Sequence, residues 1–404
     1  MSTSRTIAWV IWLSASIFYA YQYILRVMPN IMLDDLMHQF NIDAAIFGQY
    51  SGVYYIGYCL MHLPLGIMLD RYGPRKVMTG CILLTVVGLL PILFTGHWIY
   101  PIVGRFLIGM GSSAAILGTF KIIRMTFKEQ QFTRMLSFTV TIGLIGAIYG
   151  GGPVSYFCMK LGYQTMVQIF AGMGVGLAAL TYWIVPDLKP MGHHSVITDV
   201  KEVFTNRKVL AICFFSGLMV GPMEGFADAW GSTFLKQIYH LDVTTASFFL
   251  SLIYVGMGFG GPLLSFISEK NGNYLRTIIG AGVIMSLGFM PLIFGFMTKN
   301  AIIMNFILIG MCSAYQIIAI YKASTYVPER VASLTTAVAN MIIMSFGYAF
   351  HAVIGNVVNL YGGPEVTTAL VYGIGIIPLT LIIGTVGFLI LYYKEQRIVQ
   401  LAKV

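Results

Sequence analysis

Charge is what this sequence has least of. Only 10% of its 404 residues are Asp, Glu, Lys or Arg, against about 25% in a soluble domain, and 57% are hydrophobic. A chain this apolar cannot cover a water-exposed surface, so we expect lipid to be its solvent. Apolar runs near 20 residues recur along its whole length, each able to cross about 30 Å of hydrocarbon. Alternating strands of about ten residues are missing, which favours helices over a β-barrel.

Cysteine pairs and catalytic motifs are also missing. The five cysteines fall inside apolar segments without CxxC or metal-ligand spacing, which predicts buried thiols and no metal site. The sequence has no phosphate-cradling loop, no HExxH and no nucleophile beside a base. We therefore expect a protein that is not an enzyme, needs no cofactor and cannot use ATP by itself. The first apolar segment is too long for a signal peptide, so we expect it to be retained as a helix.

The apolar pattern predicts an all-α integral membrane protein with twelve transmembrane helices in two pseudo-symmetric six-helix bundles. The first bundle comprises residues 1–186, a polar linker covers 187–206, and the second bundle with a short tail covers 207–404. The predicted spans are 7–36, 43–69, 76–96, 98–125, 134–159, 163–186, 207–237, 243–268, 274–298, 300–327, 331–360 and 366–393.

Lysine and arginine divide unevenly between the two ends of these spans. If the N-terminus is cytoplasmic, the opposite side carries only Lys160, Lys236 and Lys299. The excess of basic residues on one side predicts that both termini and the linker are cytoplasmic. Because the net charge of +9 is concentrated at helix ends on that side, it does not call for a nucleic-acid partner. The partners we expect are the lipid bilayer and a small solute.

The two halves share a short repeat. The tetrapeptide Leu-Ile-Gly-Met at 107–110 recurs at 308–311, and a lysine follows each copy at the same offset, Lys121 and Lys322. Repeated halves are typical of transporters.

The loop after the second predicted helix has a recognisable pattern. It reads Gly66-Ile-Met-Leu-Asp70-Arg71-Tyr-Gly73-Pro-Arg75-Lys76 and resembles the signature loop of the major facilitator superfamily. In this interpretation Gly66 lets a helix of the other half pack closely, and Asp70 pairs with Arg71, Arg75 or a neighbouring helix end. The cluster would then act as a conformational latch, held in one state and released in the other. The alternative is a plain basic loop that anchors two helices.

Three further segments refine the resemblance. Residues 105–114 look like the superfamily's helix-four motif, whereas 143–153 are glycine-rich without the order of its antiporter motif, so export is less supported. Residues 19–30 resemble helix one of the phagosomal transporters of intracellular bacteria and of the lysosomal dipeptide transporters. This resemblance implies uptake of amino acids, peptides or nucleosides by a monomer in a bacterial cytoplasmic (inner) membrane.

Charged residues inside spans are costly and are candidates for function. Arg26, Arg105 and Asp228 each lie eight residues, about 12 Å, from the outer charged boundary, and Glu224 lies one turn from Asp228. Helices one, four and seven line the central cavity in the superfamily, which implies that these four side chains converge there. Arg26 would bind a carboxylate, Glu224 or Asp228 would bind an ammonium group or a coupling proton, and Arg105 is a further candidate for substrate binding. The alternative is an ion-pair network that never meets the solute.

The remaining candidates are uncharged or lie nearer the cytoplasm. Lys121 and Lys322 are expected either to hold an anionic group or to extend to the interface. Tyr19, Tyr23 and Arg26 share one face of helix one, a stripe suited to a solute with a ring and an acid, or simply to packing. Gln316 and Asn340 are candidates for the cavity lining, and His351 is expected to have a structural role.

The sequence thus predicts a secondary transporter that works by alternating access. We expect uptake of a small zwitterion, an amino acid or short peptide, by proton symport or facilitated diffusion. In a nucleoside transporter, the alternative, Tyr19 and Tyr23 would stack on the base. A drug or metabolite exporter and a membrane-embedded sensor are weaker alternatives.

Overall fold

The computed structural model describes residues 5–128, 131–186 and 196–401, which form helices throughout most of their length. The first half contains α1 (Arg5–Val27), the 3-10 turn η1 (Met28–Ile31), α2 (Leu33–Phe40), α3 (Ala44–Phe94), α4 (Ile99–Thr126), α5 (Phe132–Gly150), α6 (Gly152–Leu161) and α7 (Tyr163–Ile184). The second half contains α9 (Arg207–Leu218), the π-helix η3 (Gly221–Trp230), α10 (Gly231–Tyr239), α11 (Val243–Asn271), α12 (Tyr274–Ile293), α13 (Lys299–Ser313), α14 (Tyr315–Ser324), α15 (Glu329–Leu360) and α16 (Thr367–Leu401).

Eleven helical segments of the described chain are long and apolar enough to cross a membrane, and α3 is the longest at 51 residues. It is two spans joined at a kink, because Gly73 has a φ of 79° and a ψ of 160°. A side chain with a Cβ rarely adopts this backbone, whereas glycine does so freely. With the two arms of α3 counted separately the bundle has twelve spans, and the predicted fold is confirmed.

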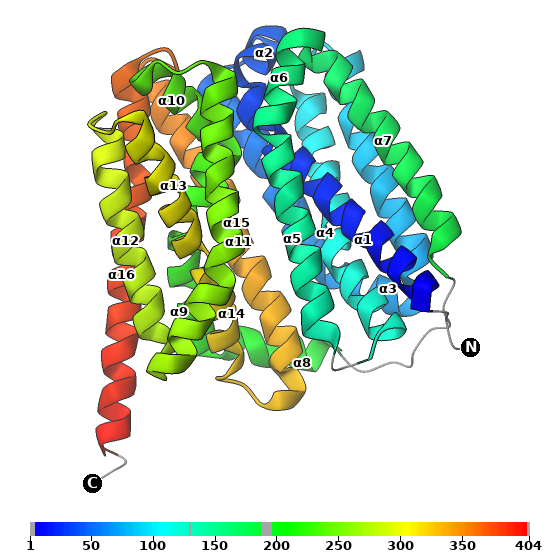
Figure 1. The fold of residues 1–404 in the computed structure, drawn as a ribbon, viewed down its shortest axis with the longest axis vertical. Coiled ribbons are helices and arrows are strands. Elements are labelled where there is room, and N and C mark those ends of the chain that lie inside the picture. The colour runs from blue at the N-terminus through cyan, green and yellow to red at the C-terminus, as the bar shows by residue number, and fades with distance from the viewer. Residues whose placement is uncertain (1–4, 129–130, 187–195, 402–404) are drawn as a thin grey trace.

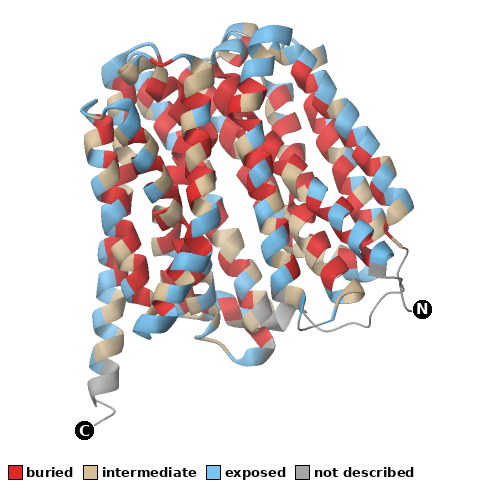
Figure 2. Cartoon of the chain, viewed as in Figure 1, coloured by how far each residue is buried: buried red, intermediate tan, exposed pale blue. Residues whose placement is uncertain are grey.

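The helices form two bundles that lie side by side (Figure 1). In the first, α1 packs on α4 and α5 while α3 packs on α4 and α7; in the second, α11 packs on α13 and α12 packs on α16. Buried residues gather along the interior and exposed ones along the outside (Figure 2). That outer surface is apolar, with Phe94 and Trp183 each 78% exposed, as expected of a surface that faces lipid.

Three spans are interrupted. The fifth breaks at Gly151 between α5 and α6, the tenth breaks at Ala314 between α13 and α14, and the seventh passes through the π-helical η3. Pro222 removes a backbone donor at the start of η3, which opposes a regular helix there. The predicted linker also contains a helix, α8 (Val196–Thr205), which packs on α9 and α15. The rest of that linker, 187–195, lies outside the described residues.

Contacts between the halves gather at the end of the bundle that lies opposite both described chain ends, which we call the distal end (Figure 1). There the backbone N–H of Ser232 donates to Asn30 Oδ1 at 3.0 Å, and Asn359 Nδ2 donates to Asp43 Oδ2 at 3.2 Å. Helices α3 and α15 touch backbone to backbone, since a Cβ added at Gly48 would lie 2.4 Å from the His351 carbonyl oxygen. The distal end is therefore closed in this structure.

Candidate functional site

An arginine and two carboxylates meet inside the bundle, at the boundary between its halves. Arg26 on α1 donates from Nε to Asp228 Oδ2 at 2.7 Å, and its Nη2 bonds Glu224 Oε2. Arg26 is 8% exposed, Glu224 1% and Asp228 0%. The structure thus brings together three of the four charged residues that were predicted from their depth. We call Arg26, Glu224, Asp228 and the two tyrosines described below the central cluster.

The π-helical turn places both carboxylates on one side of the seventh span. Glu224 and Asp228 are four residues apart within η3, where backbone hydrogen bonds join residues five apart. Such turns are uncommon and occur frequently at functional sites. All ten residues of η3 are buried, so the acids are held by packing on every side.

Two tyrosines that the sequence interpretation missed complete the central cluster. Tyr55 Oη on α3 donates to Glu224 Oε2 at 2.5 Å and also lies within hydrogen-bonding distance of Asp228 Oδ2, while Tyr254 on α11 donates to Asp228 Oδ1. The Tyr55 ring also lies 5.3 Å from the Arg26 guanidinium carbon. A buried phenol needs a partner, so tyrosines in the middle of spans were the available signal.

Arg105 lies beside the cluster but bonds the backbone. Its Nη1 and Nη2 donate to the carbonyl oxygens of Leu25 and Arg26 at 2.5 and 2.7 Å, and its guanidinium covers the Tyr54 ring at 4.8 Å. The last carbonyls of a helix lack intrahelical partners, and a cation suits that end of the helix. Arg105 therefore braces the end of α1, whereas the sequence interpretation directed it toward the solute.

The predicted aromatic stripe is present on α1. The Tyr19 and Tyr23 rings meet edge to face with centroids 5.2 Å apart, and the Arg26 guanidinium carbon lies 5.3 Å from the Tyr23 ring. Gly143 on α5 leaves room for them, because a Cβ there would lie 2.6 Å from the Tyr19 ring. Tyr23 is buried and Tyr19 half-buried, so the stripe packs against α5 as well as adjoining the cluster.

The other uncharged candidates lie on the second half. Gln316 is 5% exposed and its Nε2 finds no hydrogen-bond partner in the described part of the chain, whereas Asn340 is half-buried. His351, expected to be structural, lies at the contact of α15 with α3, and its Nε2 bonds the backbone oxygen of Glu224. It therefore supports the π-helical turn that carries the carboxylates.

The two repeat lysines are both ion-paired. Lys121 Nζ lies 2.5 Å from Asp70 Oδ1, and Lys322 Nζ lies 3.1 Å from Glu395 Oε1. Each pair stays within one half of the protein. In this conformation both lysines are thus neutralised by a carboxylate rather than presented to a bound anion.

The signature loop differs in detail from its predicted latch. Asp70 pairs with Lys121, while Arg75 covers the Tyr182 ring at 4.2 Å and Arg71 the ring of the next residue at 5.4 Å. Gly66 has nothing within 4 Å of an added Cβ, so no helix packs closely on it in this state. In this structure the distal end of the bundle is closed. Gly66 lies toward the opposite end, where the predicted latch is not engaged.

The described residues offer no metal centre. Within that part of the chain no set of three His, Cys, Asp or Glu side chains could hold an ion, and all five cysteines are free thiols. The chemistry available in the central cluster is therefore hydrogen bonding, ion pairing and proton exchange.

Comparisons with known proteins agree with this architecture. The model of the Major Facilitator Superfamily matches residues 11–352. The uncharacterized transporter YybO of Bacillus subtilis (strain 168) is 24% identical over 301 residues, which cover 65% of this chain and 67% of that protein. An uncharacterized transporter of Rickettsia felis is 23% identical over 63% of this chain and 64% of its own length. The chloramphenicol resistance protein CraA of Acinetobacter baumannii is 22% identical over 81% and 80%.

Solved structures share the fold over nearly the whole chain. A bacterial homologue of the human lysosomal transporter Spinster has a TM-score of 0.72 at 16% identity and covers 96% of both chains. A mutant of the nucleoside transporter NupG has a TM-score of 0.77 at 17% identity, covering 94% of this chain and all of the other. A POT family transporter in complex with a conjugated peptide has a TM-score of 0.75 at 12% identity, covering 97% and 96%. At these identities the likeness concerns the fold alone.

The family model covers most of the chain, and the twelve spans, the two bundles and the signature loop agree with it. The chain is a multi-pass membrane transporter, not an enzyme, and it belongs to the Major Facilitator Superfamily.

Proposed function

We propose that this transporter takes up a small zwitterion, an amino acid or a short peptide, at the central cluster. The observation that carries the proposal is that two buried carboxylates share one guanidinium across the boundary between the halves. A zwitterion would place its carboxylate on Arg26 and its ammonium group on Glu224 or Asp228. When such a solute breaks the ion pairs of Arg26 with the two acids, it replaces each of them with an ion pair of its own. The free-energy cost of keeping these charges buried is thereby limited.

The hydrogen bonds of the cluster support a role for a proton. Tyr55 has one hydroxyl proton but lies within hydrogen-bonding distance of both Glu224 and Asp228. Asp228 already accepts from Arg26 and Tyr254, so an additional proton on Glu224 would satisfy the second contact of Tyr55. It would also balance the charge of Arg26 with one remaining carboxylate. Proton symport is thus the coupling that we propose.

The positions of the contacts support alternating access. The distal end is closed by bonds between the halves, whereas Asp70 and Lys121 pair within the first half near the other end. Rocking of the two bundles would open the distal end and bring a helix of the second half toward Gly66. We propose that both termini are cytoplasmic, that the membrane is a bacterial inner membrane, and that one chain suffices. The resemblance to phagosomal and lysosomal dipeptide transporters agrees with this assignment.

Uptake into proteoliposomes tests the proposal. Wild-type protein should transport one class in a panel of amino acids and dipeptides, faster with an inward proton gradient. Arg26→Ala and Asp228→Asn should lose that uptake. Arg134→Ala, which removes an exposed arginine, is the matched control and should keep it. The zwitterion site is wrong if both cluster variants transport every solute as the wild type does.

A nucleoside transporter is the second candidate, favoured by the stripe of Tyr19 and Tyr23 beside Arg26. The rings would stack on a base, and the charged cluster would then be structural. Inhibition of uptake by thymidine, without inhibition by any amino acid, would decide for it. Under that outcome Tyr19→Ala should weaken thymidine binding by roughly 1–3 kcal/mol, the usual value of stacking on an aromatic side chain.

A further inference from the structure

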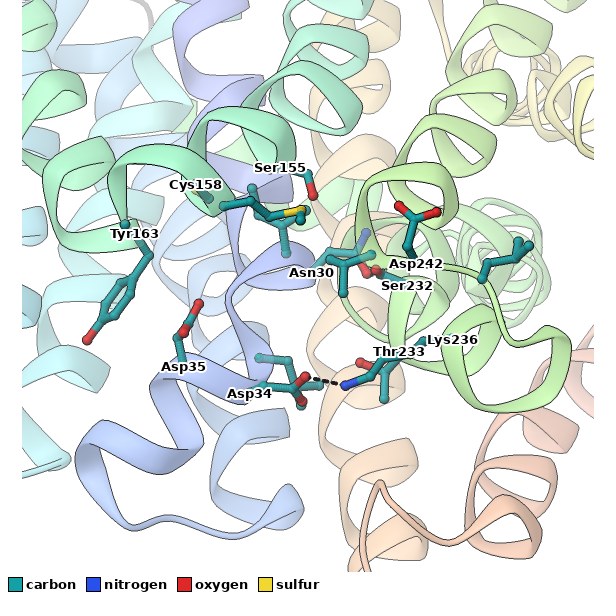
Figure 3. Close-up of a pocket in the computed structure, with 16 residues that line it drawn as sticks. Asn30, Asp34, Asp35, Ser155, Cys158, Tyr163, Ser232, Thr233, Lys236 and Asp242 are labelled. Carbon is teal, nitrogen blue, oxygen red and sulfur yellow. Dashed lines mark hydrogen bonds and ion pairs between the residues drawn. The ribbon is translucent and has the colours of Figure 1, made fainter.

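A cavity lies at the distal end, apart from the central cluster. Its volume is about 580 Å³, and both halves line it (Figure 3). The first half contributes the end of the first span with α2 and α6, and the second contributes α10 and the start of α11. We call it the distal cavity, and none of its lining residues belongs to the central cluster.

The lining of the distal cavity is acidic. It includes the carboxylates of Asp34, Asp35 and Asp242 and one ammonium group, that of Lys236. Lys236 pairs with Asp34 at 2.7 Å, and Asp242 accepts the backbone N–H of Thr245 at 2.9 Å, where it caps α11. In a protein with a net charge of +9, a lining with two uncompensated negative charges is a local reversal of sign.

Asp35 is the carboxylate without a cation. The structure describes no ion pair for it within the described residues. Burial raises the pKa of Asp35, the neighbouring Asp34 raises it further, and His38 on the same helix opposes the shift. A positive group in the distal cavity would oppose both effects, because it would favour the charged form of Asp35.

Ser155 is a second polar feature of the distal cavity. It lies on α6, is only 1% exposed and lines the distal cavity, and its hydroxyl has no hydrogen-bond partner among the described residues. Figure 3 shows this hydroxyl directed toward the side of the cavity where Asn30 lies. Asn30 Oδ1 accepts the N–H of Ser232 at 3.0 Å. Buried hydroxyls usually have a hydrogen-bond partner, and a polar group in the distal cavity beside Ser155 would supply one.

We propose that the distal cavity is a binding site for small primary amines that carry a second polar group. The ammonium group lies against Asp35, and the second group reaches the hydroxyl of Ser155. A diamine, an amino alcohol or an amino acid has this chemistry, and the volume accommodates any of them. The site goes beyond the central cluster, because it needs no carboxylate on its ligand.

Binding of putrescine to the purified transporter, measured by calorimetry, tests this site. Putrescine has two ammonium groups and no carboxylate. The wild type should bind it saturably at about 1 mM or tighter. Asp35→Asn and Ser155→Ala should each weaken binding about fivefold, the size expected of one half-exposed ion pair or one hydrogen bond. Glu269→Gln, which removes an exposed carboxylate at the far end of α11 and outside the lining, is the matched control and should not change the affinity.

The outcomes separate this proposal from the proposed transport function. Unchanged affinity in both cavity variants, equal weakening in Glu269→Gln, or no saturable binding would each overturn the amine site. None of these results affects the expected loss of uptake in Asp228→Asn. A second titration with L-alanine identifies the natural ligand. Displacement of putrescine indicates an entry site for zwitterions, and no displacement indicates a site for other amines.

Discussion

Neutralising the central cluster in steps should separate its effect on stability from its role in transport. Arg26→Met leaves Glu224 and Asp228 buried without a cation. Removal of one partner of a buried pair costs about 3–5 kcal/mol, and Asp228 is stranded in this variant even when Glu224 is protonated. Glu224→Gln leaves Arg26 with Asp228 and should cost only about 1 kcal/mol, one hydrogen bond's worth. The triple variant with Arg26→Met, Glu224→Gln and Asp228→Asn has no stranded charge and should recover most of the loss.

Thermal unfolding in detergent and uptake in proteoliposomes are measured on the same preparations. The expected order of stability is wild type, Glu224→Gln, the triple variant and last Arg26→Met, while the triple variant transports nothing. Wild-type stability in Arg26→Met would refute the electrostatic reasoning. A triple variant that transports at the wild-type rate would show that the charges bond only one another.

Three further predictions concern the gate, the signature loop and the distal cavity. Gly48→Val should open the distal end, because the new side chain meets a backbone carbonyl of α15 that cannot move aside. Spin-label distances between α2 and α10 should then lengthen. Gly80→Val is the control and should leave these distances unchanged, because a Cβ at Gly80 has nothing within 4 Å. Gly73→Ala should cost about 1–2 kcal/mol because φ is 79°, whereas Gly66→Ala should cost nothing in this state, both measured by thermal unfolding. Putrescine binding should weaken as the pH falls, because only the carboxylate form of Asp35 attracts an amine. The pKa of Asp35 is raised, so the midpoint should lie above about 3.9, the ordinary value for Asp. A pH series of titrations in which binding stays constant down to a pH of about 3.9 would contradict this prediction.

The approach of Arg26 to Glu224 and Asp228 was predictable although about 200 residues separate them. Depth in a membrane follows from the rise of 1.5 Å per residue, counted from a charged boundary. Two oppositely charged side chains at equal depth, on helices that the family resemblance places around one cavity, are expected to meet there. The same count placed Arg105 at the same depth but gave no rotation about its helix, and its side chain bonds the carbonyl oxygens of Leu25 and Arg26 instead.

The features that the sequence did not reveal depend on packing. The π-helical turn of η3 arises around Gly221 and Pro222, residues that also occur in ordinary kinks. Tyr55 and Tyr254 are two of 24 tyrosines, and nothing in their spacing singles them out. The helix 196–205 is only ten residues long and lies in a polar stretch, so its hydrophobic periodicity covers too short a window to be distinctive. The π-helical turn, the two tyrosines and the linker helix can each be recognised only once the residues that pack against them are known.

The central cluster has a consequence for how the empty transporter returns. Arg26 joins the halves by bonding both acids, as the ammonium group of a bound zwitterion would. A ligand shifts a conformational equilibrium only by its difference in affinity for the two states. Because Arg26 substitutes for the ligand's ammonium group, the closed state is stabilised in the empty transporter as well as in the loaded one. The empty transporter should therefore reorient nearly as fast as the loaded transporter. We therefore expect solute exchange to exceed net uptake by no more than a few-fold. Exchange more than about a hundredfold faster, a difference of nearly 3 kcal/mol, would mean that Arg26 does not replace the solute.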